Sequence, residues 1–113
     1  MTNIYKIVTR EEWAEASAAG VFTGAPIDHQ DGYIHFSTAG QVRETAAKHF
    51  HGRNNLLLVT VNADTLGTDL KWEPSRGGDL FPHLYSELPV SFATAVHPLE
   101  DRPDGSHKFP EKF

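Results

Sequence analysis

Residues 56 to 61 read Leu-Leu-Leu-Val-Thr-Val, and this run is the strongest structural signal in the chain. A strand that is buried on both faces reads as a continuous apolar run rich in branched side chains, whereas a half-exposed strand alternates apolar and polar residues. We therefore predict that Leu56 to Val61 form a central strand between packed layers, with leucines that are buried on both of its faces.

A helix is predicted well upstream of this strand. Thr9 to Glu12 has the pattern of a capping box, and Gly20 suits the position after a helix end, so the helix is placed at about residues 10 to 19. The turn residues from Gly24 to Gly32 show no periodicity and are interpreted as a loop. This loop leads into a strand at Tyr33 to Phe36.

A second helix is predicted between the two strands. Thr38 to Gln41 resembles another capping box, and apolar residues at helical spacing follow it, which predicts a helix over about residues 39 to 50. Ser37 or Thr38 is expected to cap it. A strand that runs directly into a helix N-terminus places free N–H groups beside Ser37, and such groups attract anions or polarised carbonyl groups.

Short strands are predicted after the central run, at Leu70 to Glu73, Leu80 to Tyr85 and Val90 to Val96. Two early helices followed by late strands indicate an α+β fold, with the helices packed on small, mostly antiparallel sheets. We expect residues 1–113 to form a single domain with a core at about residues 3–97. The C-terminal tail, residues 98–113, has little to bury except Phe109 and Phe113 and is expected to be loosely attached.

Composition excludes several classes of function. The chain has 113 residues, 10 Lys and Arg against 15 Asp and Glu, a net charge of −5 and no cysteine. The acidic balance disfavours nucleic acid as a partner, and the lack of cysteine excludes disulfides, iron–sulfur clusters and a thiol nucleophile. The longest apolar run is far shorter than the roughly 20 residues of a membrane-spanning helix, and no export signal is visible. A cytoplasmic protein with no membrane contact is expected.

The most informative stretch for chemistry is Asp31 to Ser37, Asp-Gly-Tyr-Ile-His-Phe-Ser. Side chains alternate along a strand, so Tyr33 and His35 share one face while Ile34 and Phe36 share the other. His35 beside the Ser37 hydroxyl is a candidate site. A hydrogen-bonded interior histidine and an ordinary capping serine explain the same pattern equally well.

A second candidate lies at Leu80 to Tyr85, where His83 and Tyr85 alternate onto one face and are able to bind a polar ligand together. Glu73 ends a short strand and is placed to polarise a ribose hydroxyl or a water molecule. Arg76 lies in a glycine-rich turn and is a candidate clamp for phosphate or carboxylate. Half-buried or solvated structural roles remain open for all of these side chains.

Several segments together resemble a family of bacterial and plant proteins, the "domain of unknown function 952" family, over about residues 3 to 97. The segments are Tyr5-Lys6-Ile7, Trp13, Gly20-Val21-Phe22, Asp31 to Ser37 with Gln41, Leu70-Lys71-Trp72-Glu73 and Leu80 to Tyr85. The family is grouped with the ADP-ribosyltransferase-like fold. The resemblance implies a split, two-sheet α+β core with a cleft shaped for NAD, which is a substrate in that fold.

The resemblance also implies roles for individual residues. His35 matches the histidine that binds the nicotinamide ribose. His83 or Tyr85 takes the place of the ring that stacks on nicotinamide. Glu73 is the best glutamate available to orient the nucleophile, although its place in the chain order is not that of the family's late glutamate. The catalytic candidates are therefore His35 and Glu73. The candidate ligand-binding residues are Ser37, Gln41, Arg76, His83 and Tyr85.

Three functions follow as hypotheses. The first is nucleotide binding, with NAD as the nucleotide, together with ADP-ribosyl transfer or cleavage of a glycosidic bond. The second is a non-catalytic domain that binds a small ligand or a partner; Phe36 in place of the usual glycine after the histidine, and the lack of a late glutamate, favour it. The third is a metal hydrolase that uses Asp31, His35 and His83, for which no ligand spacing is visible, so no metal is expected.

Overall fold

The computed structural model describes residues 2–113, except for the side chain of Arg76. These residues form an α+β fold in which all recorded strand pairs are antiparallel. The helices are α1 (Arg10–Ala19), α2 (Pro26–Asp31) and α3 (Val42–His49). The strands are β1 (Asn3–Thr9), β2 (Val21–Phe22), β3 (Ile34–His35), β4 (Ser37–Thr38), β5 (Leu56–Asn62), β6 (Leu70–Ser75), β7 (Asp79–Leu84), β8 (Leu88–Pro89), β9 (Ala93–Asp101) and β10 (His107–Lys108). Short 3-10 turns lie at Ala63–Thr65, Gly67–Asp69, Arg76–Gly78 and Val90–Phe92.

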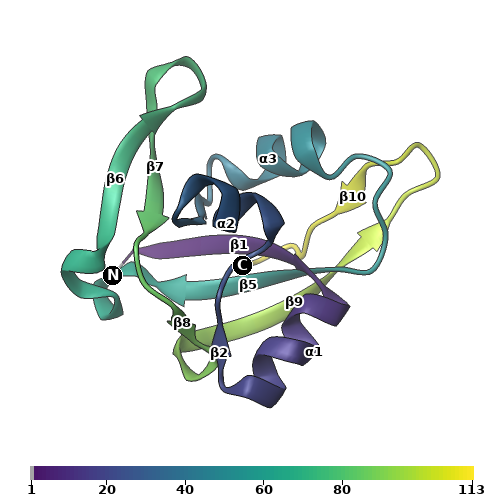
Figure 1. The fold of residues 1–113 in the computed structure, drawn as a ribbon. Helices are drawn as coiled ribbons and strands as arrows, with labels where there is room; N and C mark the ends of the chain where they lie inside the picture. The colour runs from purple at the N-terminus through teal and green to yellow at the C-terminus, as the bar shows by residue number, and fades with distance from the viewer. Residues whose placement is uncertain (1) are drawn as a thin grey trace.

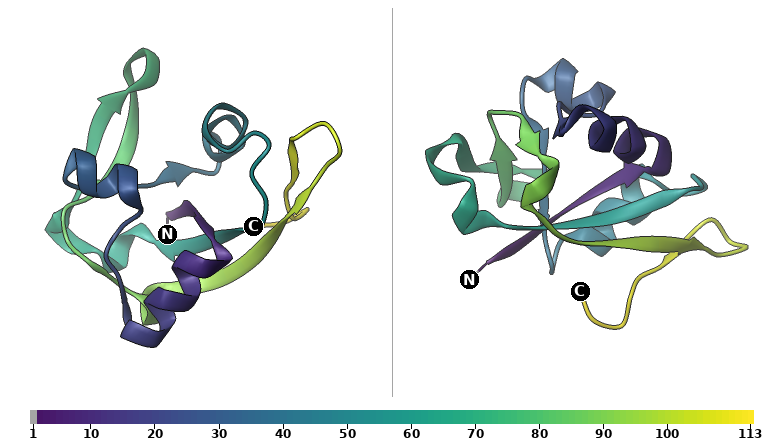
Figure 2. Two further views of the ribbon diagram at one scale, coloured as in Figure 1. Left: turned by 45° about the vertical axis from the view of Figure 1, so that its right-hand side comes forward. Right: turned by 90° about the horizontal axis from the view of Figure 1, so that it is seen from below.

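The strands of the described residues form three sheets. The largest has five strands in the order β10-β9-β5-β1-β4, the second has the order β3-β7-β6, and β2 pairs with β8. The hairpin of β6 and β7 rises away from the large sheet (Figure 1). Further views show α1 and α3 on different sides of that sheet (Figure 2).

Strand β5 confirms the prediction of a central strand. It pairs with β1 on one side and β9 on the other, and every side chain from Leu56 to Val61 is buried. Leu57 and Val59 belong to the core cluster that contains Ala16 of α1, whereas Leu58 belongs to the cluster that contains residues of α3. The continuous apolar run is therefore explained by two packed layers, one on each face of the sheet.

Helix α1 also confirms its prediction, in both bounds and caps. The side chain of Thr9 accepts a hydrogen bond from the Glu12 backbone, and the Glu12 side chain accepts one from the Thr9 backbone, which completes the capping box. Gly20 follows the helix with φ 87°, a left-handed conformation that glycine adopts without strain.

The interpretation of Gly24 to Gly32 as a loop is wrong, because α2 forms within it. Pro26 stands at the start of the helix, where the missing N–H of proline has no cost, and Gly32 follows its end with φ 88°. Asp28 accepts a hydrogen bond from the Ala25 backbone at 2.8 Å, which stabilises the first turn. Turn-forming residues here mark the two ends of a short helix.

The strand predicted at Tyr33 to Phe36 is shorter than expected. Only Ile34 and His35 form β3, which pairs with β7, and the chain then joins the large sheet as β4 beside β1. Phe36, between the two strands, donates its N–H to the Pro82 carbonyl at 3.0 Å. The predicted alternation is confirmed, since Ile34 and Phe36 are buried in the core while Tyr33 and His35 are part-exposed on the other face.

The predicted start of the second helix is wrong. Helix α3 begins at Val42 rather than near residue 39, and Ser37 and Thr38 form β4 instead of a cap. Ser37 is 4% exposed, and its hydroxyl is 2.9 Å from that of Thr45. Pairing of β4 with β1 outweighs the local capping signal, so Ser37 does not cap α3, and its hydroxyl is bonded to that of Thr45 instead.

The C-terminal tail is packed on the fold, contrary to the expectation of loose attachment. Strand β9 runs on to Asp101 and pairs with β10. Phe109 and Phe113 pack against the core cluster on the α3 side, and the Phe113 ring meets that of Tyr5 edge-on at 5.2 Å. Strand pairing and the two aromatic side chains together hold the tail on the fold. No helix within residues 2–113 has the length and apolar character needed to cross a membrane.

Candidate functional site

The carboxylate of Asp28 is the structural centre of the candidate site. Its side chain is almost completely buried and lies 2.9 Å from Nζ of Lys6, which is also buried. Asp28 Oδ1 accepts hydrogen bonds from the His35 backbone at 3.1 Å and from His35 Nδ1 at 2.6 Å. One carboxylate thus joins α2, β1 and β3, and it fixes the ring of His35.

The charge on Asp28 is stabilised despite its burial. Burial opposes ionisation, but the hydrogen bond from His35, the charge of Lys6 and the Ala25 N–H together hold the pKa of Asp28 at about 2. Burial also lowers the pKa of Lys6, while the charge of Asp28 and its hydrogen bond oppose that change. An ionised Asp28 accepts hydrogen bonds only, so His35 Nδ1 must carry a proton.

The second nitrogen of His35 faces another carboxylate. Nε2 lies 2.8 Å from Oδ2 of Asp31, which is four residues away and exposed to solvent. Nδ1 and Nε2 of His35 therefore each have a carboxylate oxygen within hydrogen-bond distance. His35 is therefore a part-exposed ring that is fixed between two carboxylates.

Four rings converge above β3 and β7, and we call Tyr33, His35, His83 and Tyr85 the ring cluster. The Tyr33 ring is stacked on that of His83 with centroids 4.1 Å apart, and it lies 4.6 Å from the His35 ring and 5.2 Å from the Tyr85 ring. Register explains the convergence, because His35 pairs directly with His83 across the two strands. His83 is buried at the base of the ring cluster, whereas Tyr85 is 43% exposed.

Glu73 of β6 stands at the edge of the ring cluster. Its Oε1 accepts a hydrogen bond from the Tyr85 hydroxyl at 2.7 Å and lies 2.8 Å from His83 Nδ1. These two contacts, first Tyr85 and then His83, lower the pKa of Glu73, and the Glu73 carboxylate raises the pKa of Tyr85 to about 12. At neutral pH the pair is therefore an ionised carboxylate and a neutral phenol.

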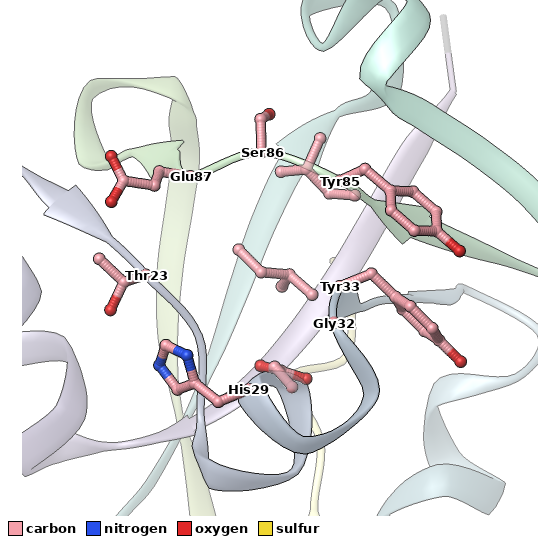
Figure 3. Close-up of a pocket in the computed structure, with 10 residues that line it drawn as sticks. Thr23, His29, Gly32, Tyr33, Tyr85, Ser86 and Glu87 are labelled. Carbon is pink, nitrogen blue, oxygen red and sulfur yellow. The ribbon is translucent and has the colours of Figure 1, made fainter.

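A pocket of about 260 Å³ adjoins the ring cluster. Ten residues line it: Thr23, Asp28, His29, Gly32, Tyr33, Ile34, Leu84, Tyr85, Ser86 and Glu87. The rings of Tyr33 and Tyr85 lie side by side at one end, and Thr23, His29 and Glu87 lie at the other (Figure 3). A ligand in this pocket would contact aromatic rings at one end and hydroxyl, imidazole and carboxylate groups at the other.

The sequence-predicted site residues fall into two groups. The structure brings His35, Glu73, His83 and Tyr85 together in and beside the ring cluster. Ser37 is buried, and its hydroxyl is bonded to that of Thr45 in α3 rather than facing these rings. Gln41 accepts a hydrogen bond from the Thr38 N–H and donates one to the Leu80 carbonyl, so it ties the start of α3 to β7. The side chain of Arg76 lies outside the described residues.

Asp28 and Tyr33 are the parts of the site that sequence reasoning missed. The signal for Asp28 was its place between Pro26 and Gly32, which are typical residues for the start and end of a short helix. Tyr33 was placed on the correct face but was not proposed as a site residue. Within residues 2–113 no three His, Asp or Glu side chains are grouped so as to hold a metal ion, so the described chain offers no ligand set for the metal-hydrolase hypothesis.

Comparison with known proteins shows relatives of the same size and shape. The family model described as "Protein of unknown function (DUF952)" matches residues 7–96. The crystal structure of protein CC0527 from Caulobacter crescentus is similar, with 51% identity over 95% of this chain and 94% of that chain and a TM-score of 0.92. The solution NMR structure of CC0527 is 53% identical over 94% of this chain and 91% of that chain, with a TM-score of 0.84. No curated protein matches the chain. The family match covers most of the sequence, and the chain therefore belongs to the DUF952 family.

Proposed function

We propose that the ring cluster and the adjoining pocket bind a nucleotide of the NAD type. The observation that carries this proposal is the position of Tyr33, which contacts three other rings and lines the pocket. Aromatic surface with a few fixed polar groups at its edge is typical of small-ligand sites. Nucleotides have the matching chemistry, because a flat base stacks on rings and ribose hydroxyls bond to carboxylates and imidazoles.

Each part of the ligand has a matching group in this proposal. The part-exposed ring of Tyr85 stacks on the nicotinamide base, and His35 with Asp31 bonds the ribose hydroxyls. Asp31 is exposed, so it is free to turn from His35 Nε2 toward a ligand. Thr23 and Glu87 offer polar contacts for the rest of the molecule at the far end of the pocket. These roles accord with a relationship to the ADP-ribosyltransferase-like fold, which we include in the proposal.

The corresponding reaction is ADP-ribosyl transfer or cleavage of the glycosidic bond. The bond between ribose C1′ and the nicotinamide nitrogen breaks, and nicotinamide leaves with the electron pair. The oxygen of water or of an acceptor hydroxyl bonds to C1′ and releases its proton to solvent. Glu73, ionised at neutral pH, would stabilise the positive charge that develops on the ribose, and His35 would hold the ribose in place.

The second candidate function is a non-catalytic domain that binds the nucleotide without cleaving it. The state of Glu73 favours this candidate, because hydrogen bonds from Tyr85 and His83 lower its pKa. A carboxylate of low pKa is a weak general base and would activate an acceptor hydroxyl poorly. Binding and cleavage are therefore tested separately.

Thermal unfolding with NAD, ADP-ribose and nicotinamide tests the binding proposal. A ligand at 100 times its Kd stabilises the folded protein by about 2.7 kcal/mol. We expect His35→Ala to lose this gain and His51→Ala, a change at an exposed histidine outside the ring cluster, to keep it. If His35→Ala unfolds without ligand, His35 has a structural role, and Tyr85→Ala then serves as the binding variant.

An unchanged wild-type melting temperature with all three ligands in millimolar excess would contradict the proposal. Release of free nicotinamide from NAD distinguishes the two candidate functions. Wild-type protein that releases nicotinamide, with loss of release in Glu73→Gln, supports the enzyme. Stabilisation by NAD without any release supports the non-catalytic domain.

A further inference from the structure

Negative charge surrounds the ring cluster on two sides. Asp28 and Asp31 lie against the two nitrogens of His35, and Glu73 lies against His83 and Tyr85. After burial, the charges of Asp31, Glu73 and Asp28 all raise the pKa of the Tyr33 hydroxyl. The carboxylates therefore act together at the centre of the ring cluster, where they favour positive charge and oppose negative charge.

The lysines near the ring cluster offset its negative charge only in part. Lys6 is buried beneath Asp28 and is paired with it at 2.9 Å. The His35 ring is held between Asp28 and Asp31, so two carboxylates face its two nitrogens. Lys71 of β6 is exposed and offsets part of the negative charge of Glu73. Two lysines therefore stand against the three carboxylates Asp28, Asp31 and Glu73.

The ring faces supply a second attraction for a cation. Tyr85 is exposed, Tyr33 is part-exposed, and both line the pocket. A cation over a tyrosine face is attracted by the negative charge of the π system, and a nearby carboxylate adds to that attraction. A flat ring that carries a positive charge would be bound both by stacking on the tyrosine rings and by attraction to the nearby carboxylates.

We infer that the ring cluster selects a ligand ring that carries a positive charge over the uncharged form of the same ring. This inference rests on the proposed function. Applied to that function, it names the oxidised nicotinamide nucleotide as the ligand, because its nicotinamide is a pyridinium cation, whereas the ring of the reduced nucleotide is uncharged. Glu73 and Asp31 are the residues that set this specificity.

Two small probes test the inference directly on the full chain. 1-Methylnicotinamide is a cation and nicotinamide is its uncharged counterpart, and both are titrated while the ring protons of Tyr33 and Tyr85 are followed by NMR. We expect the cation to bind at least about fivefold more tightly, as a cation–π contact beside a carboxylate predicts. Higher ionic strength should weaken binding of the cation and leave nicotinamide unchanged.

Variants with an amide in place of a carboxylate locate the source of the selectivity. Glu73→Gln keeps an oxygen that accepts a hydrogen bond from Tyr85 but removes the charge, and it should reduce the preference to about twofold or less. Glu100→Gln, at an exposed position on β9 outside the ring cluster, should leave the preference unchanged. Melting curves confirm that both variants are folded, and the salt dependence of the wild-type protein is measured without any variant.

The outcomes separate this inference from the proposed function. If both probes and NAD shift the ring cluster but the two probes bind equally, or nicotinamide binds more tightly, charge selection is wrong and nucleotide binding stands. If neither probe nor NAD shifts the ring cluster, both the inference and the proposed function are wrong. A preference that persists undiminished in Glu73→Gln would overturn the assignment of specificity to Glu73.

Discussion

The central strand β5 and the ring cluster are stabilised by different kinds of interaction. In β5 every side chain from Leu56 to Val61 is buried, and apolar packing on both faces holds it. Beneath the ring cluster lies the buried ion pair of Lys6 and Asp28. Asp28 bonds to His35, and Glu73 bonds to His83 and Tyr85. An apolar core tolerates many combinations of apolar side chains, whereas a buried charge requires its particular partner. Substitutions should therefore affect the two regions differently.

The largest loss of stability is expected from Asp28→Ala. This change leaves Lys6 buried without its partner, and removal of one member of a buried ion pair costs about 3–5 kcal/mol. Urea unfolding measures the loss. Asp64→Ala, at an exposed aspartate, is the control and should change stability by less than about 0.5 kcal/mol. An equally small change for Asp28→Ala would show that charge pairing does not hold the site.

Leu58→Ala should destabilise the protein by about 2–5 kcal/mol, because Leu58 is fully buried and its loss leaves a cavity between β5 and α3. Ligand affinity of the folded variant should match that of the wild type. A loss below about 1 kcal/mol in urea unfolding would show that this strand is not a close-packed centre. A large change in affinity would show that the two regions are coupled.

Acid should remove the contribution of Asp28 to the free energy of unfolding. The folded pKa of Asp28 is about 2, below the ordinary value of about 4, so its contribution is present above about pH 4 and is lost as the pH falls toward 2. Urea unfolding of the wild type and Asp28→Asn from pH 7 to pH 2 measures this. The difference between the two free energies of unfolding should shrink below pH 4. A constant difference would mean that Asp28 is not held ionised by its neighbours.

Tyr85→Phe should have the smallest effect on stability but should clearly raise the pKa of Glu73. Tyr85 is exposed, and its hydroxyl makes the first of the contacts that lower the pKa of Glu73. Without that hydroxyl the Glu73 carboxyl should titrate at a higher pH in an NMR titration, with little change in melting temperature. An unchanged Glu73 titration would contradict the hydrogen bond between the two side chains.

Sequence patterns predict those parts of the fold that depend on interactions between residues close together in the chain. Leu56 to Val61 and the capping box of α1 were predicted because a burial pattern and two side chain–backbone hydrogen bonds define them. Alternation also placed Tyr33 with His35, and His83 with Tyr85. Each of these features depends on residues close together in the chain.

The rest depends on contacts between distant segments. The break between β3 and β4 reflects pairing with two different strands, and no local signal marks that choice. The ion pair of Lys6 and Asp28 joins residues 22 positions apart across β1 and α2. Sequence therefore predicts three rings of the candidate site, His35, His83 and Tyr85, and misses Tyr33 and the buried carboxylate of Asp28.

The most direct test of the central claim is NMR mapping of NAD binding on the wild-type chain. The account predicts shifts concentrated at Tyr33, His35, His83 and Tyr85, with resonances of Leu56 to Val61 unchanged. Shifts at a different surface, or none at millimolar NAD, would contradict the claim that the ring cluster is a nucleotide-binding site.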